Sequence, residues 1–219
     1  MIKSKTMRAF IFDMDGVIFD TELLWKLAFE KANKRFNVTL NEEYRISICG
    51  KNEMVIRNEL KSILPSLDVE AYRNYTIQSV NNDISDGKYS IKKGFFSLIN
   101  NIKMYGMKVA LATSSHEARA VKLFERKGVS ISDFFDVTVF GDEVGSKSKP
   151  DPYIFQLAAQ KLNLAPQECC VVEDSINGVK AAISGGFRCI MVEDLIPPDN
   201  FCFSNADKIV KELYEIDIN

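Results

Sequence analysis

The sequence predicts an α/β protein with a doubly wound parallel sheet that is interrupted by one helical insert. Short apolar runs alternate along the chain with segments whose apolar residues recur at helical spacing, an order typical of parallel α/β sheets. Several runs are apolar almost throughout, as expected of strands buried on both faces. One long stretch, residues 20–87, contains no such run and breaks the alternation.

The expected strands are short runs rich in β-branched or aromatic side chains, at residues 8–12, 108–112, 137–140, 169–172 and 188–192. The expected helices of the core are amphipathic segments at residues 95–104, 117–127, 153–162 and 176–184. Further helices are expected in the insert, at residues 21–36, 54–64 and 69–80.

The length of 219 residues suits one domain with a smaller insert. We therefore expect a discontinuous core domain made of residues 1–19 and 88–219. The inserted residues 20–87 are expected to form a separate helical cap domain above the sheet.

Composition excludes several classes of function. The 28 Lys and Arg against 30 Asp and Glu give a net charge of −2, which provides no reason to expect a nucleic-acid partner. No window is long and apolar enough to span a membrane. The single histidine excludes a multi-histidine metal site, and five cysteines without a C-x-x-C spacing favour a reduced, cytoplasmic protein.

Two acidic side chains, Asp13 and Asp15, directly follow the first expected strand. Ligands of open α/β sheets bind at the carboxyl ends of strands. Two close carboxylates repel each other unless a cation or a proton lies between them, and Mg²⁺ favours such oxygen ligands. Taken alone, so short a pattern is more typical of loop aspartates that cap a turn.

Hydroxyl groups follow the second strand, where Thr113 and Ser114 precede a helix. Free N–H groups at a helix start bind phosphate oxygens, and the Thr113 hydroxyl adds a donor. Ser114 and Glu117 also have the spacing of a capping box, which is a purely structural use. His116 is interpreted as a solvated residue of the first helical turn.

Two further segments follow later strands. Lys149 directly precedes Pro150 and Pro152, two prolines that make a rigid entry to the next helix. A lysine held there is able to neutralise a phosphate or a carboxylate. Glu173 and Asp174 end another buried strand. Asp174 is either a helix N-cap or a metal ligand that completes an oxygen site with Asp13.

All four segments fall at predicted carboxyl ends of strands, and together they supply acids, hydroxyls and a cation. This inventory predicts a Mg²⁺-assisted phosphoryl-transfer site. The chain lacks the motif G-x-x-x-x-G-K-[ST], so a P-loop nucleotidase or kinase is not indicated.

The segments DMDGVIFDTE, LATSS, KSKPDPYIF and VVEDSINGVKAA resemble the four ordered motifs of the haloacid dehalogenase (HAD) superfamily. The chain is most similar to the subgroup with β-phosphoglucomutase, phosphoglycolate phosphatase and sugar-phosphate phosphatases. The insert matches the cap domain of that subgroup in position and size. The resemblance implies a Rossmann-like HAD core.

Catalytic roles follow from the resemblance. Asp13 matches the nucleophile that becomes an aspartyl-phosphate, and Asp15 matches the general acid and base. Thr113 matches the hydroxyl that binds the transferring phosphoryl group, and Ser114 is expected to add its backbone N–H. Lys149 matches the lysine that offsets charge between the nucleophile and the phosphate.

The resemblance also implies the metal ligands. Asp174 matches a Mg²⁺ ligand, and Glu173 is either a direct ligand or an outer partner. The Asp13 carboxylate and the Asp15 backbone carbonyl are the other expected ligands. The presence of Asp15 favours phosphate esters over carbon–halogen or carbon–phosphorus bonds.

Substrate choice is expected to depend on the cap residues Trp25, Lys51, Asn52 and Arg57. Trp25 stands where the mutases carry a histidine, and no arginine follows Gly50 until Arg57, so a phosphatase is favoured over a mutase. Trp25 is equally consistent with packing between cap helices.

The resulting prediction is a monomeric, cytoplasmic, Mg²⁺-dependent phosphatase acting on small phosphate monoesters, sugar phosphates above all. Its partner is a small phosphorylated metabolite, without nucleic acid or membrane, and closure of the cap excludes water. The alternatives are a β-phosphoglucomutase-like mutase and a non-catalytic sugar-phosphate-binding protein.

Overall fold

The computed structural model describes residues 7–218 and contains one six-stranded parallel sheet with the strand order β3-β2-β1-β4-β5-β6. This is the order of a doubly wound, Rossmann-like fold, so the predicted fold class is confirmed. The strands are β1 Ala9–Phe12, β2 Lys108–Ala112, β3 Val137–Val139, β4 Cys169–Glu173, β5 Arg188–Val192 and β6 Lys208–Val210.

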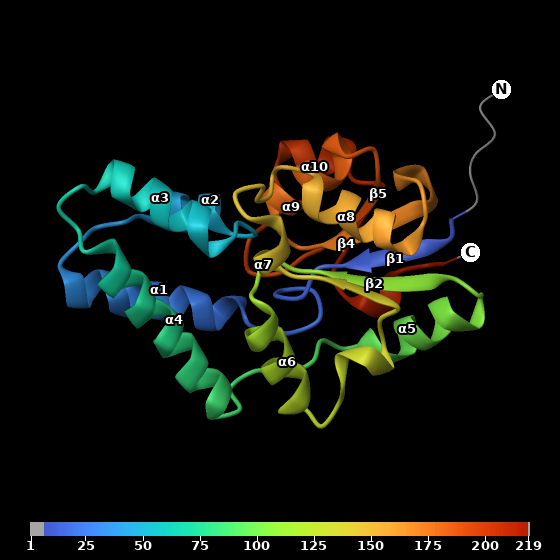
Figure 1. Ribbon diagram of the computed structural model, residues 1–219, viewed down its shortest axis with the longest axis horizontal. Helices are drawn as coiled ribbons and strands as arrows, with labels where there is room; N and C mark the ends of the chain where they lie inside the picture. The colour runs from blue at the N-terminus through green and yellow to red at the C-terminus, as the bar shows by residue number, and fades with distance from the viewer. Residues whose placement is uncertain (1–6, 219) are drawn as a thin grey trace.

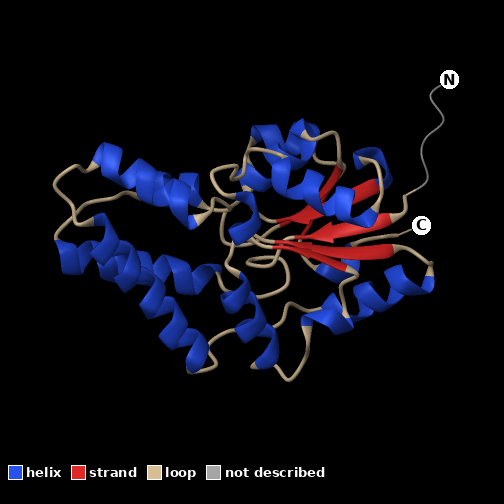
Figure 2. Ribbon diagram, viewed as in Figure 1, coloured by secondary structure: helices blue, strands red, loops and turns tan. Residues whose placement is uncertain are grey.

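Helices cover both faces of the sheet (Figure 2). Side chains of a strand alternate between its two faces, and in β1 Phe10 and Phe12 join one buried cluster while Ala9 and Ile11 join another. The first cluster includes residues of α5 Phe95–Met104 and α6 Glu117–Glu125, and the second includes residues of α8 Tyr153–Leu162, α9 Ile176–Ser184 and α10 Asn200–Asn205.

Four helices between β1 and α5 form a group beside the sheet, here called the helical lobe (Figure 1). They are α1 Glu22–Phe36, α2 Glu42–Ile48, α3 Glu53–Ile63 and α4 Val69–Ser85. The lobe has a hydrophobic cluster of its own, which includes Phe29 and Tyr72. Leu24 of α1 and Ile84 of α4 also join the first cluster, so these two helices pack against the core as well.

The structure adds elements that the sequence did not predict: α2, α10, the short helix α7 Gly141–Val144 and the edge strand β6. Helix α4 continues to Ser85, five residues beyond the expected end at residue 80, whereas α6 ends two residues early. Residues 1–6 and 219 of the predicted core domain lie outside the described residues. Within residues 7–218, no helix is long and apolar enough to cross a lipid bilayer.

Candidate functional site

Three neighbouring strands end at the same level of the sheet. Phe12 of β1 lies opposite Leu111 of β2 and opposite Val172 of β4. Asp13 and Thr113 therefore leave the sheet beside Glu173, because parallel strands in this register end at one edge.

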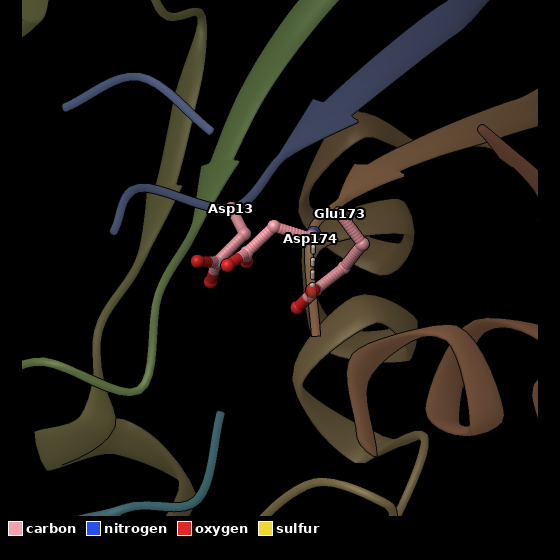
Figure 3. Close-up of side chains that lie close together, drawn as sticks. All are labelled: Asp13, Glu173 and Asp174. Carbon is pink, nitrogen blue, oxygen red and sulfur yellow. Dashed lines mark hydrogen bonds between the residues drawn. The ribbon is translucent and has the colours of Figure 1, made fainter. Parts of the chain in front are cut away.

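Three carboxylates meet at this edge. Asp13, Glu173 and Asp174 are buried, and one oxygen atom from each lies within 4.8 Å of those of the other two. Figure 3 shows the carboxylates of Asp13 and Asp174 close together at the ends of β1 and β4. Burial, and to a lesser extent the charge of Glu173, raises the pKa of Asp13 to about 7, although the charge of Lys149 acts to lower it.

Lys149 supplies the positive charge of the cluster. Its fully buried ammonium donates to Asp13 Oδ1 at 2.6 Å and also to Glu173 Oε1. Burial alone would lower the pKa of Lys149, but the charges of the two carboxylates outweigh it and raise this pKa. The predicted position of Lys149 beside Asp13 is therefore observed.

Glu173 is held by the chain itself. Its Oε2 accepts hydrogen bonds from the backbone N–H groups of Asp174 and Ser175 at 2.8 and 2.7 Å, and from the Ser175 hydroxyl at 3.0 Å. A Cβ atom on Gly178 would lie 1.9 Å from Glu173 Oε1, so only glycine leaves room for this carboxylate. Both oxygens of Glu173 are thus engaged, which suits an outer position around a cation.

Asp174 has no capping role. Ser175 is the N-cap of α9 and accepts from Gly178 N at 3.0 Å, so the alternative assignment of Asp174 as a helix cap is wrong. Gly16 has φ +76°, and a Cβ atom there would lie 2.0 Å from Asp174 Oδ2. Burial, followed by the charges of Glu173 and Glu22, raises the pKa of Asp174 well above its ordinary value.

These residues fit a small divalent cation. Hard oxygen donors are gathered in a buried cluster, and burial together with like charges raises the pKa values of Asp13 and Asp174. A cation between the two carboxylates would relieve this repulsion, and Mg²⁺ takes such ligands. Three of the four residues expected to hold the metal, Asp13, Glu173 and Asp174, therefore lie together.

Asp15 is fixed by an arginine that the sequence did not single out. Arg119 Nη1 donates to Asp15 Oδ2 at 2.6 Å and Nη2 to Oδ1 at 2.7 Å. Ser115 Oγ donates to Oδ2 at 3.0 Å, and Thr21 Oγ1 donates to Oδ1. Burial alone would raise the pKa of Asp15, but the Arg119 charge and these hydrogen bonds lower it. Asp15 is therefore held as an oriented carboxylate.

Thr113 and Ser114, the hydroxyl residues after β2, make different contacts. Thr113 is buried and lines the cavity, and its Oγ1 accepts from Ser115 N at 3.1 Å. Ser114 lines the cavity too, but its hydroxyl donates to Gly50 O of the helical lobe at 2.7 Å. The N-cap of α6 is His116, so the capping box of Ser114 and Glu117 is not formed. The His116 side chain is exposed, as expected, and pairs with Asp142.

A cavity of ≈ 160 Å³ lies between these strand ends and the helical lobe. Trp25 and Lys51 line it, as predicted. Asn52 and Arg57 do not belong to the lining: Asn52 is the N-cap of α3 and donates to Gly145 O, and Arg57 pairs with Glu70. A cavity of this size suits a small ligand.

Several residues that line the cavity were not predicted from the sequence. Arg45, Arg73 and Glu22 line the cavity from α2, α4 and α1. Burial, followed by the charges of Asp15 and Asp194, raises the pKa of Glu22 to about 8. Arg119 lies in α6, and its Nη1 donates at 2.7 Å to Oγ of Ser115, which precedes the helix.

Comparison with known proteins agrees with the site. A family model described as haloacid dehalogenase-like hydrolase matches residues 7–186. A phosphorylated carbohydrates phosphatase of Thermotoga maritima is 32% identical over 185 residues, which cover 83% of each chain. The protein CbbY of Cereibacter sphaeroides is 29% identical over 96% of this chain and 94% of its own.

Solved structures share the fold. A variant of CbbY from Rhodobacter sphaeroides, crystallised with xylulose-(1,5)-bisphosphate, superposes with a TM-score of 0.78 at 24% identity over 96% of each chain. A β-phosphoglucomutase from Clostridium difficile superposes with a TM-score of 0.78 at 23% identity, over 97% of this chain and 94% of its own. The chain belongs to the haloacid dehalogenase-like hydrolase family and is an enzyme.

Proposed function

We propose that this hydrolase is a Mg²⁺-dependent phosphatase that acts on small phosphate monoesters, sugar phosphates above all. The observation that carries the proposal is the contact of Asp13 with Lys149 inside a buried acidic cluster, with Asp15 facing the same cavity. The phosphatase among its relatives supports the reaction type.

In this proposal Asp13 is the nucleophile. One of its carboxylate oxygens attacks the phosphorus atom, and the bond between phosphorus and the ester oxygen breaks, which gives an aspartyl-phosphate and an alcohol. The Lys149 ammonium favours the ionised form of Asp13 and offsets the charge of the incoming phosphate. Thr113, at the cavity wall, is placed to donate to a phosphoryl oxygen.

Asp15 moves the protons. Its carboxylate, held ionised by Arg119, takes the proton of a monoanionic phosphate ester and passes it to the leaving ester oxygen, and the regenerated carboxylate then takes a proton from the water that hydrolyses the aspartyl-phosphate. The bidentate contact with Arg119 stabilises this carboxylate between the two transfers and fixes its orientation for both.

Asp13, Asp174 and the backbone carbonyl of Asp15 would hold the Mg²⁺ ion, with Glu173 as an outer partner. When bound, the ion neutralises charge on the transferring phosphoryl group. The buried, repelling carboxylates support this assignment, because they need a cation in order to be ionised together.

Residues 20–87 would act as the cap domain. The helical lobe faces the strand ends across the cavity, so its movement toward the core would seal the substrate from bulk water. Ser114, which donates to Gly50 O, contributes to the seam between lobe and core in this proposal.

Release of inorganic phosphate from a panel of phosphorylated metabolites, with and without Mg²⁺, tests the function. We expect turnover that requires Mg²⁺, and Asp13→Asn should lower it by at least about 1,000-fold. Asp142→Asn, which changes an exposed carboxylate, is the control and should retain activity. Wild-type turnover by the Asp13 variant would refute the mechanism, and conversion of β-glucose 1-phosphate to the 6-phosphate without phosphate release would favour a mutase.

A further inference from the structure

The side of the cavity formed by the helical lobe, here called the lobe wall, carries three cations. Arg45 comes from α2, Lys51 from the following loop and Arg73 from α4. The two arginine side chains are 4% exposed. Buried arginines facing a phosphatase site would ordinarily favour a ligand with a second phosphate or a carboxylate.

Both arginines are already bound by carboxylates. Arg45 donates through Nε and Nη2 to the two oxygens of Glu42 at 2.8 and 2.7 Å. Arg73 donates in the same way to Glu53 at 2.9 and 2.8 Å. Such two-point contacts occupy the Nε and Nη2 edge of each guanidinium and place a neutralising carboxylate against it.

Lys51 is also paired with a carboxylate, because its ammonium contacts Glu59 Oε1 at 2.7 Å. Each cation of the lobe wall therefore has a carboxylate within hydrogen-bond distance, and the charges cancel. A dianionic group entering here would have to displace a carboxylate or remain beside it, and either event is costly in a buried site.

The remaining lobe wall suits an uncharged ligand. Trp25, Phe29 and Ile56 provide apolar surface for the C–H groups of a sugar, and the bound carboxylates retain acceptor capacity for hydroxyl groups. Glu53 itself lines the cavity and is the carboxylate nearest to a ligand among these pairs, since Glu42 and Glu59 are outside the lining.

We infer that the lobe wall selects phosphate esters whose remaining part is an uncharged polyol, and that Glu53 and Glu42 exclude bisphosphates by neutralising Arg73 and Arg45. This inference rests on the proposed function and narrows its substrate class. In this preference for monophosphates the chain would differ from the CbbY variant that was crystallised with a bisphosphate.

The test compares glucose 6-phosphate with glucose 1,6-bisphosphate as competitors of p-nitrophenyl phosphate hydrolysis. We expect the wild-type enzyme to bind the bisphosphate no more tightly than the monophosphate. Glu53→Gln leaves Arg73 with an uncompensated charge, so it should tighten binding of the bisphosphate by about tenfold or more and change the monophosphate by less than about threefold.

Glu70→Gln is the matched control, because it removes the same charge from an exposed carboxylate that pairs with Arg57 and Lys61 outside the cavity lining. Its two inhibition constants should equal those of the wild type. Glu42→Gln is the second variant if Glu53→Gln does not fold, since Glu42 is 54% exposed and its loss disturbs less packing.

A wild-type enzyme that binds the bisphosphate tenfold more tightly than the monophosphate would overturn the inference. So would a folded Glu53 or Glu42 variant with unchanged selectivity. Failure of the proposed function is a different result, because the wild-type enzyme would then not hydrolyse p-nitrophenyl phosphate or any monoester of the panel with Mg²⁺.

Discussion

At the scale of single residues, Arg119 is the residue whose role is least expected from the sequence. It contacts both oxygens of Asp15, and its guanidinium lies 5.2 Å from the ring centre of Trp25 in the helical lobe. Arg119 therefore positions the proposed acid and base and touches the lobe at the same time. Its effect on catalysis is indirect, through the orientation and charge of Asp15.

Replacement of this guanidinium tests that role. We expect Arg119→Met to lower kcat/KM for a sugar phosphate about 10- to 100-fold, because Asp15 becomes a weaker and poorly oriented acid. The kcat/KM for p-nitrophenyl phosphate should fall by less than about threefold, since its leaving group departs without a proton. Steady-state kinetics with both substrates measures the difference.

Arg126→Met provides the control from the same region, because Arg126 is exposed and donates to Ser85 O away from the cavity. It should leave both substrates unaffected. Equal losses on the two substrates in the Arg119 variant would show that the residue supports the fold rather than the proton transfer.

At the scale of secondary structure elements, the sequence predicts best the strands that are buried on both faces of the sheet. The four central or near-central strands β1, β2, β4 and β5 are apolar except for one charged residue at an end of β2, β4 and β5, so their positions follow from the sequence alone. The edge strand β6 has three residues, of which Lys208 is exposed, and its pattern resembles a loop.

Site residues that follow buried strands were easier to predict from the sequence than site residues on the helices of the lobe. Asp13, Thr113 and Asp174 were predictable because strand register alone brings them together. Among the lobe residues, Trp25 and Lys51 were predicted but Arg45 and Arg73 were not, because the face that a helix turns to the cavity depends on packing between helices. Arg57 and Arg73 both contact Glu53, yet only Arg73 lines the cavity.

The start of α3 offers a test at this scale. Asn52 caps α3 by accepting from Val55 N at 3.0 Å, and its amide also donates to Gly145 O in the loop that leads to Lys149. Asn52→Ala should cost about 1 kcal/mol of folding free energy for the lost cap. It should also lower kcat/KM about two- to tenfold, because a contact between lobe and core disappears.

Asn41→Ala separates the two effects. Asn41 caps α2 in the same manner, accepting from Tyr44 N at 2.9 Å in an exposed position. Thermal unfolding should give a loss of stability for both variants, the larger one for Asn52, which also loses the contact with Gly145 O, whereas kinetics should show reduced activity in the Asn52 variant alone. A matching loss of activity in the Asn41 variant would mean that lobe stability, not the contact with the core, controls turnover.

At the scale of the whole molecule, the net charge of −2 hides a local excess of negative charge at the junction of core and lobe. Asp13 has a pKa of about 7 in the folded protein and 3.8 as a free side chain. The folded state therefore binds more protons than the unfolded state between these values. In the absence of metal, this carboxyl makes stability fall as pH rises through that window.

Mg²⁺ should reverse this trend. At about 100 times its dissociation constant, the ion should add about 2.7 kcal/mol of stability, which corresponds to a Tm increase of about 5–10 °C for a chain of this size. The increase should be larger at pH 8 than at pH 6, because at pH 6 the ion must displace protons from Asp13 and Asp174, whose pKa values are raised. Thermal unfolding with MgCl₂, against NaCl of equal ionic strength, measures it.

Asp174→Asn distinguishes metal binding from a general salt effect. Loss of this buried negative charge removes repulsion from Asp13 and Glu173, so the metal-free variant should melt at the same temperature as the wild type or higher. Its Tm should no longer respond to Mg²⁺, because a proposed ligand is gone. A variant that melts lower without metal yet keeps the full Mg²⁺ response would contradict both the electrostatic account and the assignment of Asp174 as a ligand.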